Sequence, residues 1–357
     1  MKKKILVTGA SGFIGRHICE VLLNTNKYLP VALEHLNPIT IKGVKKIKGD
    51  VLDLNSLKFS LKDCHAVIHC ANSYDSSLNW NVSVKGTGNI CKFCLDLKLS
   101  KLIYLSSASV YGFDLPSIVN ESTQYNKING DIYNNSKIYA EKIVNHFIDK
   151  YKLPAVILQP TIVYGPHSIP WTIDPINKIK NGNFLWMSIL QGNANPIYIN
   201  DLTEAVLLAL ENKKAIGKTF IISGGEIVSW KDFFKPYFKF AGKSLPKKTN
   251  KDSNLSASYF YFLSMIRNIL NIANIVKKIP NNIKGPFKNF YRTFLQIEEI
   301  KNNEDFLKRY AYKAYFDITK ANKILGFQPK VNFNKGMTLT KKWFLKNKKY
   351  VFEYDYY

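Results

Sequence analysis

The feature that most constrains the fold of this chain is a glycine-rich turn that joins an apolar run to an amphipathic segment near the first residue. Residues 4–9, KILVTG, predict a short buried strand, and the following segment, GASGFIGRHICEVLL, predicts a helix that begins directly after it. Gly9, Gly12 and Gly15 have GxxGxxG spacing, which permits a tight turn, close approach of a pyrophosphate and close helix packing. Because the glycines follow a strand and open a helix, the pattern favours dinucleotide binding over a simple tight turn.

Apolar strands and helical segments alternate along the first part of the chain. A segment rich in Ser, Asn and Asp predicts a loop between residues 72 and 82. The alternation is typical of a parallel sheet with helices on both faces, so we expect an α/β protein with a Rossmann-type doubly wound sheet. Binding and catalytic groups lie at the carboxyl ends of the strands in such a sheet. Further strands are expected at about residues 29–33, 44–50, 65–71 and 101–107, and helices from about residue 55 and at 83–97.

Acidic residues at two strand ends indicate how the adenosine half of a dinucleotide is held. Glu34 follows the second strand, where a carboxylate can accept hydrogen bonds from the ribose hydroxyls, and this favours NAD over NADP. Arg16 and His35 keep NADP open, because a cation there could accept a 2′-phosphate. Asp50 could accept from the adenine amino group, although a turn or helix-capping role is an alternative for both Asp50 and Asp53.

A second constellation supplies reactive groups. The segment DIYNNSKIYAEK, residues 131–142, predicts a helix in which Tyr133 and Lys137 are one turn apart. The Lys137 ammonium can then favour the ionised form of the Tyr133 phenol, which would make it a usable base. Ser107 ends the fifth strand and is expected to hydrogen-bond the substrate. The alternative for the pair is an ordinary Tyr and Lys on an amphipathic helix.

Composition limits the partners and the compartment. Fifty-one Lys and Arg against 26 Asp and Glu give a net charge of +25, but the lysines are spread along the chain and no nucleic-acid motif appears, so we expect no nucleic-acid partner. The five cysteines have no paired framework, which favours a reducing cytoplasm, and Cys91 and Cys94 recur at helical spacing as small buried residues. We expect no secretion signal, no spanning helix and no metal site.

Several ordered motifs resemble a known family. They are TGASGFIG at 8–15, SSASVYG at 106–112, YNNSK at 133–137, QPTIVYGP at 159–166 and PIYINDLTEAV at 196–206. From residue 4 to about residue 343 the chain resembles the extended short-chain dehydrogenase/reductase superfamily, in its NAD-dependent epimerase/dehydratase family. The resemblance implies that Ser107, Tyr133 and Lys137 are the catalytic residues, and that Lys137 also holds the nicotinamide ribose.

The resemblance also suggests a division of the chain and a set of cofactor contacts. We expect a NAD-binding Rossmann domain at 1–166, rejoined by about 196–228, and a discontinuous substrate-binding annex of 167–195 and 229–357, in which 167–195 is irregular. The residues expected to contact the cofactor are Gly9, Ser11, Gly12, Phe13, Ile14, Gly15, Glu34, Asp50, Val51, Cys70, Ala71, Ser83, Tyr133 and Lys137.

Departures from the family pattern bear on the substrate. Dehydratases and decarboxylases of the family carry an acid where this chain has Ala108 and Ser109, so we expect a product that keeps every carbon and oxygen, unless Asp75, Asp114 or Glu121 supplies the acid. Ile162 replaces an Asn, and the segment QGNANP before 197 lacks an Arg, so two contacts to a sugar nucleotide's diphosphate are absent. Ser83 replaces an Asn that contacts the cofactor in the family.

Three functions follow as hypotheses. The first is a NAD-dependent sugar-nucleotide epimerase or related sugar oxidoreductase, the second a dehydrogenase of a lipophilic alcohol that resembles 3β-hydroxysteroid dehydrogenases, and the third a non-catalytic NAD-sensing protein. The apolar segment 256–278 predicts a helix of the annex core, or alternatively one that lies on a membrane surface or lines a lipophilic pocket. A homodimer and a membrane-peripheral location are left open, and the C-terminal tail has no assigned role.

Overall fold

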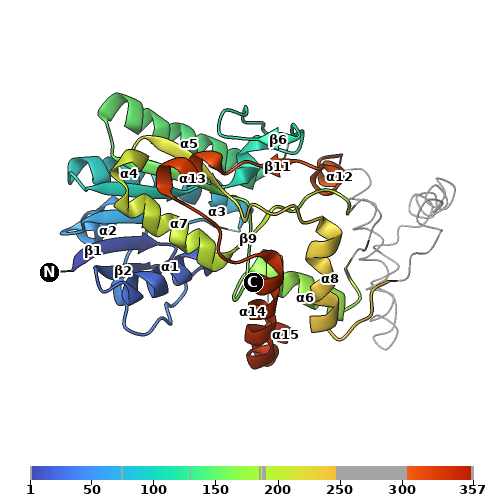
Figure 1. Ribbon diagram of the computed structural model, residues 1–357. Helices are drawn as coiled ribbons and strands as arrows, with labels where there is room; N and C mark the ends of the chain where they lie inside the picture. The colour runs from blue at the N-terminus through green and yellow to red at the C-terminus, as the bar shows by residue number, and fades with distance from the viewer. Residues whose placement is uncertain are drawn as a thin grey trace, which may run out of the picture.

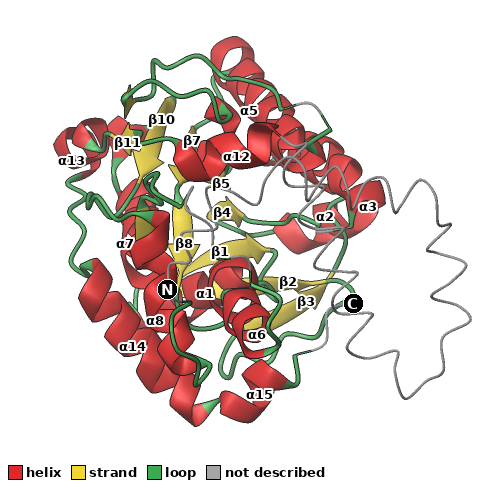
Figure 2. Cartoon of the chain, turned by 90° about the vertical axis from the view of Figure 1, so that its right-hand side faces the viewer, coloured by secondary structure: helices red, strands yellow, loops and turns green. Residues whose placement is uncertain are grey.

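A seven-stranded parallel sheet forms the centre of the molecule, and it confirms the Rossmann-type α/β prediction (Figure 2). The computed structural model describes residues 2–73, 75–128, 130–184, 186, 190–246 and 304–354. The strand order reverses direction at β1, so the carboxyl ends of β1 and β4 flank the switch point of the sheet. Across the sheet the strands are β10 (Lys218–Ile222), β7 (Ala155–Pro160), β5 (Lys101–Leu105), β4 (Ala66–His69), β1 (Lys3–Thr8), β2 (Tyr28–Glu34) and β3 (Lys45–Lys48).

Helices cover both faces of the sheet (Figure 1). Successive side chains of a strand face opposite sides: Ile5 and Val7 belong to one buried cluster and Leu6 to the other. Central strands buried on both faces read as the continuous apolar runs seen in the sequence. The first cluster includes buried residues of α1 (Phe13–Asn24), α7 (Ile199–Glu211) and α13 (Thr319–Leu325), and the second those of α2 (Leu54–Leu61), α4 (Gly86–Asp96) and α5 (Ile132–Tyr151).

In the described part of the annex, helices pack against each other through aromatic side chains. Most of the inward side chains of α8 (Trp230–Phe240) are aromatic, and Phe240 stacks on Phe344 of α14 (Phe333–Lys346) with ring centroids 5.7 Å apart. Other described elements are the two-stranded pairs β8 (Ile162–Tyr164) with β9 (Pro196–Tyr198) and β6 (Ile118–Val119) with β11 (Tyr315–Phe316), α12 (Glu304–Ala311) and α15 (Lys348–Phe352).

Two predicted irregular segments are wrong. The loop expected at 72–82 contains α3 (Ser76–Trp80), which continues through a π-helical turn, η1 (Asn81–Lys85), into α4; the Asp75 carboxylate caps α3 by accepting from the Ser77 N–H at 2.8 Å. The segment 167–195 contains η3 (Ile169–Ile173) and α6 (Asp174–Lys180). Tertiary packing, not intrinsic propensity, stabilises these short helices, so no apolar period in the sequence predicts them.

Other expectations have mixed outcomes. The five cysteines lie in the described part and are free, and Cys91 and Cys94 are buried in the core, as predicted. Burial raises the pKa of Cys91 to about 12, so its thiol is not poised for redox chemistry. None of the described helices is both long and apolar enough to cross a bilayer. The segment 256–278 lies outside the described residues, and the residue bounds of the two-part division stay a prediction.

Candidate active site

The glycine turn between β1 and α1 fits a dinucleotide pyrophosphate. Gly9 has φ +65°, and a Cβ there would lie 2.8 Å from the backbone of Cys70 and Ala71. A Cβ on Gly15 would clash with the carbonyl group of Gly9. Gly12 is the N-cap of α1 and is exposed, so the first backbone N–H groups of the helix, which begins at Phe13, are available to an anion. The residues present therefore fit the cofactor that the sequence predicts.

Thr8 and His69 fix the ends of β1 and β4 against each other. The Thr8 hydroxyl oxygen accepts from the N–H groups of Cys70 and Ala71, both at 3.2 Å, and pairs with His69 Nδ1 at 2.6 Å. His69 Nε2 lies 3.1 Å from the Thr87 hydroxyl, and burial lowers the pKa of His69 to about 3, so the ring is neutral. Neither Thr8 nor His69 was predicted; both residue types are ordinary at strand ends.

At the adenosine end, Arg16 and His35, the residues that could accept the 2′-phosphate of NADP, have partners within the chain. Arg16 donates to Glu20 Oε1 and to the Thr40 hydroxyl, both at 3.1 Å. Glu34 accepts from the Ile39 N–H at 2.8 Å, and this hydrogen bond is the main cause that lowers the pKa of Glu34. Its second oxygen lies 3.6 Å from Lys48 Nζ. A carboxylate therefore lies at the end of β2, as the preference for NAD requires.

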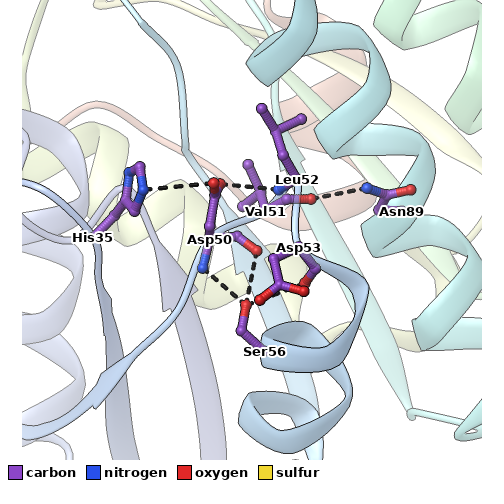
Figure 3. Close-up of polar contacts among 7 residues, drawn as sticks. All are labelled: His35, Asp50, Val51, Leu52, Asp53, Ser56 and Asn89. Carbon is purple, nitrogen blue, oxygen red and sulfur yellow. Dashed lines mark hydrogen bonds and ion pairs between the residues drawn. The ribbon is translucent and has the colours of Figure 1, made fainter.

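The turn after β3 carries Asp50 and Val51 (Figure 3). Asp50 accepts from the Leu52 N–H at 2.9 Å and lies 3.5 Å from His35 Nε2, so it has the turn role that was left open (Figure 3). Asp53 is the N-cap of α2 and accepts from the Asn55 N–H at 2.9 Å, which confirms its capping role. The Asn89 side chain donates to the Val51 carbonyl at 3.0 Å (Figure 3). Contact of Asp50 and Val51 with adenine stays a prediction.

Ser83 forms a pair that sequence reasoning missed. Its buried hydroxyl donates to Asn72 Oδ1 at 2.8 Å, across the loop that follows β4. The amide expected at position 83 is thus present nearby, but it comes from Asn72. Only the fold brings these two residues together.

The reactive groups of α5 are positioned by the helix cap. Asp131 accepts from the Asn134 N–H at 2.9 Å and starts the helix at Ile132, which places Tyr133 in the first turn and Lys137 in the second. Lys137 is 4% exposed, and its ammonium donates to the Leu105 carbonyl at 3.0 Å and lies 5.9 Å from the centroid of the Tyr133 ring. Burial lowers the pKa of Lys137 to about 8, and Cys70 and Glu141 oppose this shift.

Ser107 and Tyr133 come together at the end of β5. Ser107 Oγ accepts from the Ser109 N–H at 3.1 Å, which leaves the Ser107 O–H free to donate. Tyr133 is 38% exposed, but desolvation of its hydroxyl raises its pKa, while a hydrogen bond with Ser107 and the charge of Arg309 lower it. The net shift is upward, so the expected lowering by Lys137 is wrong for this structure; the ammonium is directed to the Leu105 carbonyl instead.

Arg309 is a further site residue that the motifs did not indicate. It lies on α12, its guanidinium carbon is 4.5 Å from the Phe113 ring centroid, and its carbonyl accepts from Trp230 Nε1 at 3.1 Å. The charge of Arg309 lowers the pKa of Tyr133, which makes the arginine a candidate for the site. Arg309 lies far along the chain from Ser107, Tyr133 and Lys137, the catalytic trio of the prediction, so spacing alone could not assign it to the site.

Comparisons with known proteins agree with this geometry. A model of the NAD dependent epimerase/dehydratase family matches residues 5–223. A 2-alkyl-3-oxoalkanoate reductase of Shewanella oneidensis is 26% identical over 93% of this chain and 84% of its own length. A dTDP-D-glucose 4,6-dehydratase of Mus musculus is 26% identical over 97% of this chain and 89% of its own length.

Solved structures show the same fold. The UDP-glucose 4-epimerase of Thermotoga maritima has a TM-score of 0.69 at 19% identity, over 96% of this chain and 99% of its own. The UDP-glucuronic acid 4-epimerase of Bacillus cereus, solved with NAD, has a TM-score of 0.68 at 24% identity over the same shares. Since the family model matches more than half of the 357 residues, this chain belongs to the NAD-dependent epimerase/dehydratase family and is an enzyme that uses NAD.

Proposed function

We propose that this enzyme catalyses oxidoreduction at a secondary alcohol or ketone of a nucleotide sugar, as an epimerase or a related sugar oxidoreductase. The observation that carries the proposal is the arrangement at the carboxyl end of β5. Ser107 follows this strand, and Lys137 donates to the Leu105 carbonyl and lies 5.9 Å from the centroid of the Tyr133 ring. Relatives named as sugar-nucleotide epimerases and dehydratases support this substrate class. Arg309 supports it as well, because a guanidinium suits a diphosphate.

The site residues have distinct roles in the proposed reaction. When bound, NAD accepts and returns a hydride at nicotinamide C4. Tyr133 takes the proton of the substrate hydroxyl during oxidation and returns a proton to the carbonyl oxygen during reduction. The Ser107 O–H donates to the same substrate oxygen, since its own oxygen already accepts from Ser109. Lys137, whose ammonium donates to the Leu105 carbonyl, would hold the nicotinamide ribose.

We propose that no water or carbon dioxide is lost. Ala108 is buried and apolar, and the buried Ser109 hydroxyl, which has no partner among the described residues, does not titrate near neutral pH. The three acids considered as substitutes are engaged elsewhere. Asp75 caps α3, Asp114 accepts from the Tyr312 hydroxyl at 2.8 Å, and Glu121 accepts from the Ile221 N–H at 2.9 Å.

A second candidate is a reductase or dehydrogenase of a lipophilic ketone or alcohol. Ile162 lies on β8, and the segment QGNANP at 191–196, in which a diphosphate-binding Arg was expected, has none. Two relatives matched over most of the chain favour this candidate: the Shewanella reductase over 93%, and a short-chain dehydrogenase/reductase family 42E member of Danio rerio over 91%.

Mass spectrometry of turnover mixtures separates the two candidates. The protein is incubated with NAD and UDP-glucose or UDP-glucuronic acid, and in parallel with NADH and 3-oxoalkanoates of different chain lengths. The proposal predicts a sugar-nucleotide product of unchanged mass or a two-hydrogen difference. A reduced lipid with inert sugar nucleotides supports the second candidate, and a product lighter by water or carbon dioxide refutes the assignment of Ala108 and Ser109.

Arg309→Leu gives the same experiment an internal check. If the arginine contacts the diphosphate, the KM for the sugar nucleotide rises by about tenfold or more, as expected for a lost charge-assisted hydrogen bond. Arg309→Lys keeps a charge but not the planar guanidinium, so its KM should lie between those of the wild type and Arg309→Leu. An unchanged KM in Arg309→Leu contradicts the role.

We also propose a reducing cytoplasmic location, which the five free cysteines support. The homodimer stays a prediction.

A further inference from the structure

Glu141 is a fully buried carboxylate that the catalytic trio does not explain. It lies one turn beyond Lys137 and two beyond Tyr133, on the same face of α5, and it is 0% exposed. The Ser106 and Tyr125 hydroxyls each donate to one of its oxygens. Gln159 Nε2 lies 3.0 Å from both oxygens. Burying a carboxylate is costly, so the three side chains arranged around this one require an explanation.

The partners of Glu141 hold both ends of the segment that carries Ser107. Ser106 immediately precedes Ser107 and donates directly to Glu141. Tyr111 ends the 3₁₀ turn η2 (Ala108–Tyr111) that follows Ser107, and its hydroxyl donates to Gln159 Oε1 at 2.6 Å. The Gln159 amide then donates to Glu141, so the carboxylate reaches the far end of the segment through one side chain.

The helix face that carries Glu141 makes further contacts with the same segment. Lys137 donates to the Leu105 carbonyl at 3.0 Å, and the Asn134 amide donates to the Ser109 carbonyl. Tyr133 starts this face, one turn before Lys137, whose ammonium lies 5.9 Å from the centroid of the Tyr133 ring. The position of Ser107 relative to Tyr133 therefore depends on how the end of β5 is attached to α5, and Glu141 is a fully buried part of this attachment.

We propose that Glu141 is a positioning residue, which fixes the segment Ser106–Tyr111 on α5 and thereby sets the Ser107 hydroxyl against Tyr133. The expected effect of Glu141 on turnover rests on the proposed function, but its expected effect on the titration of Tyr133 does not. A second effect follows from charge, because Glu141 is one of the groups that support the protonated form of Lys137.

The test is a titration of Tyr133 that needs no substrate. The ring Cζ carbons of tyrosine are labelled with ¹³C in the full chain, and the Tyr133 signal is assigned as the one absent from Tyr133→Phe. Glu141→Gln removes the charge with little change of shape, and Ser106→Ala removes only the direct link to β5. Asp201→Asn is the matched control: Asp201 is 3% exposed and accepts from Lys330 N–H and Val331 N–H, away from the Ser107 segment.

Loss of the Ser107 donor should raise the Tyr133 titration midpoint, because the hydrogen bond with Ser107 lowers the pKa of Tyr133. The charge of Arg309 also lowers this pKa, whereas the charge of Asp131 raises it. We expect an upward shift of about one pH unit in Glu141→Gln and a smaller shift of the same sign in Ser106→Ala. The double variant should resemble Glu141→Gln, since both changes act on one connection. Where turnover is measurable, kcat falls about tenfold with KM changed less than about twofold.

A merely structural role gives a different result. In that case Glu141→Gln and Asp201→Asn both lower the unfolding temperature, and the Tyr133 midpoint stays at its wild-type value in each; this outcome overturns the proposal. If Glu141→Gln does not fold, Ser106→Ala decides alone: an upward shift supports the proposal and an unchanged midpoint rejects it. If the Tyr133 midpoint shifts in the variants but the wild type does not turn over sugar nucleotides, the role of Glu141 is supported and only the substrate assignment is contradicted.

Discussion

Tyr133 and Lys137 lie on one helix face because four residues make about one helical turn. That spacing was visible in the sequence, and so was the strand end that carries Ser107. The use of the Lys137 ammonium was not visible, because its acceptor, the Leu105 carbonyl, belongs to a strand that packs beside the helix only in the folded chain. The orientation of Ser107 likewise depends on a local hydrogen bond from the Ser109 N–H.

We propose that Glu34 determines the preference for NAD over NADP. Removing its carboxylate in Glu34→Ala leaves Lys46 and Lys48 beside the ribose site, so the repulsion of a 2′-phosphate is replaced by attraction. We predict that the preference for NAD over NADP narrows by about tenfold, measured as the ratio of the two dissociation constants by calorimetry. Glu204→Ala, which removes only an exposed carboxylate paired with Lys330, should leave the ratio near its wild-type value. A wild-type protein that binds NADP more tightly than NAD contradicts the assignment.

At the scale of elements, Lys101 connects the start of β5 to the end of α7. It is 5% exposed, and its ammonium donates to the carbonyls of Ala209 and Asn212 at 2.9 and 2.8 Å. These carbonyls belong to the last turn of α7, where the helix dipole also favours a cation.

Lys101→Met keeps the aliphatic stem but leaves these carbonyls without their donor. We predict a loss of about 1–3 kcal/mol in the free energy of unfolding, measured by urea denaturation. Lys92→Met on the exposed side of α4 is the control and should change the stability little. Equal stabilities of Lys101→Met and the wild type would show that water replaces the ammonium at no cost.

Short helices mark the limit of prediction at this scale. The segment of α3 has a capping aspartate, Asp75, but no apolar period, and it was therefore expected to be a loop. In the structure Trp80 packs against Tyr139 of α5 with ring centroids 5.0 Å apart. A helix stabilised by such a contact cannot be recognised without knowing that α5 lies beside it.

At the scale of the whole molecule, buried His69 makes stability depend on pH. Its pKa is about 3 in the folded protein and near 6.5 when exposed, so between these values the unfolded chain binds more protons than the folded one. The contribution of His69 is fully present above about pH 6.5 and is lost as the pH falls toward 3.

We predict that His69→Gln flattens the dependence of the free energy of unfolding on pH between about 6.5 and 4, where one such histidine contributes up to about 1.4 kcal/mol per pH unit. His146→Gln, at an exposed position on α5, should leave the slope unchanged. Urea denaturation at a series of pH values measures both. A slope that is the same in His69→Gln and the wild type would mean that His69 is protonated in the folded state.

The N-terminal half could be predicted further than the C-terminal half for a physical reason. Its strands and helices alternate regularly, so periodicity and turn chemistry locate the sheet, the glycine turn and the trio. Arg309, on α12, contacts Phe113 through its guanidinium and Trp230 through its carbonyl, and such contacts leave no spacing in the sequence. The network of Glu141, Tyr125 and Gln159 also joins residues from separate elements.

In the proposed reaction, which uses NAD, Tyr133 exchanges a proton with the substrate. The most direct test of this role compares kcat and the NAD dissociation constant of Tyr133→Phe with those of the wild type, on whichever substrate is turned over. Tyr139→Phe, at an exposed position on the same helix, is the control. The account predicts that kcat falls by about 10²–10⁴-fold in Tyr133→Phe while NAD binding changes little, and that Tyr139→Phe stays active. Near-normal turnover by Tyr133→Phe would contradict the account.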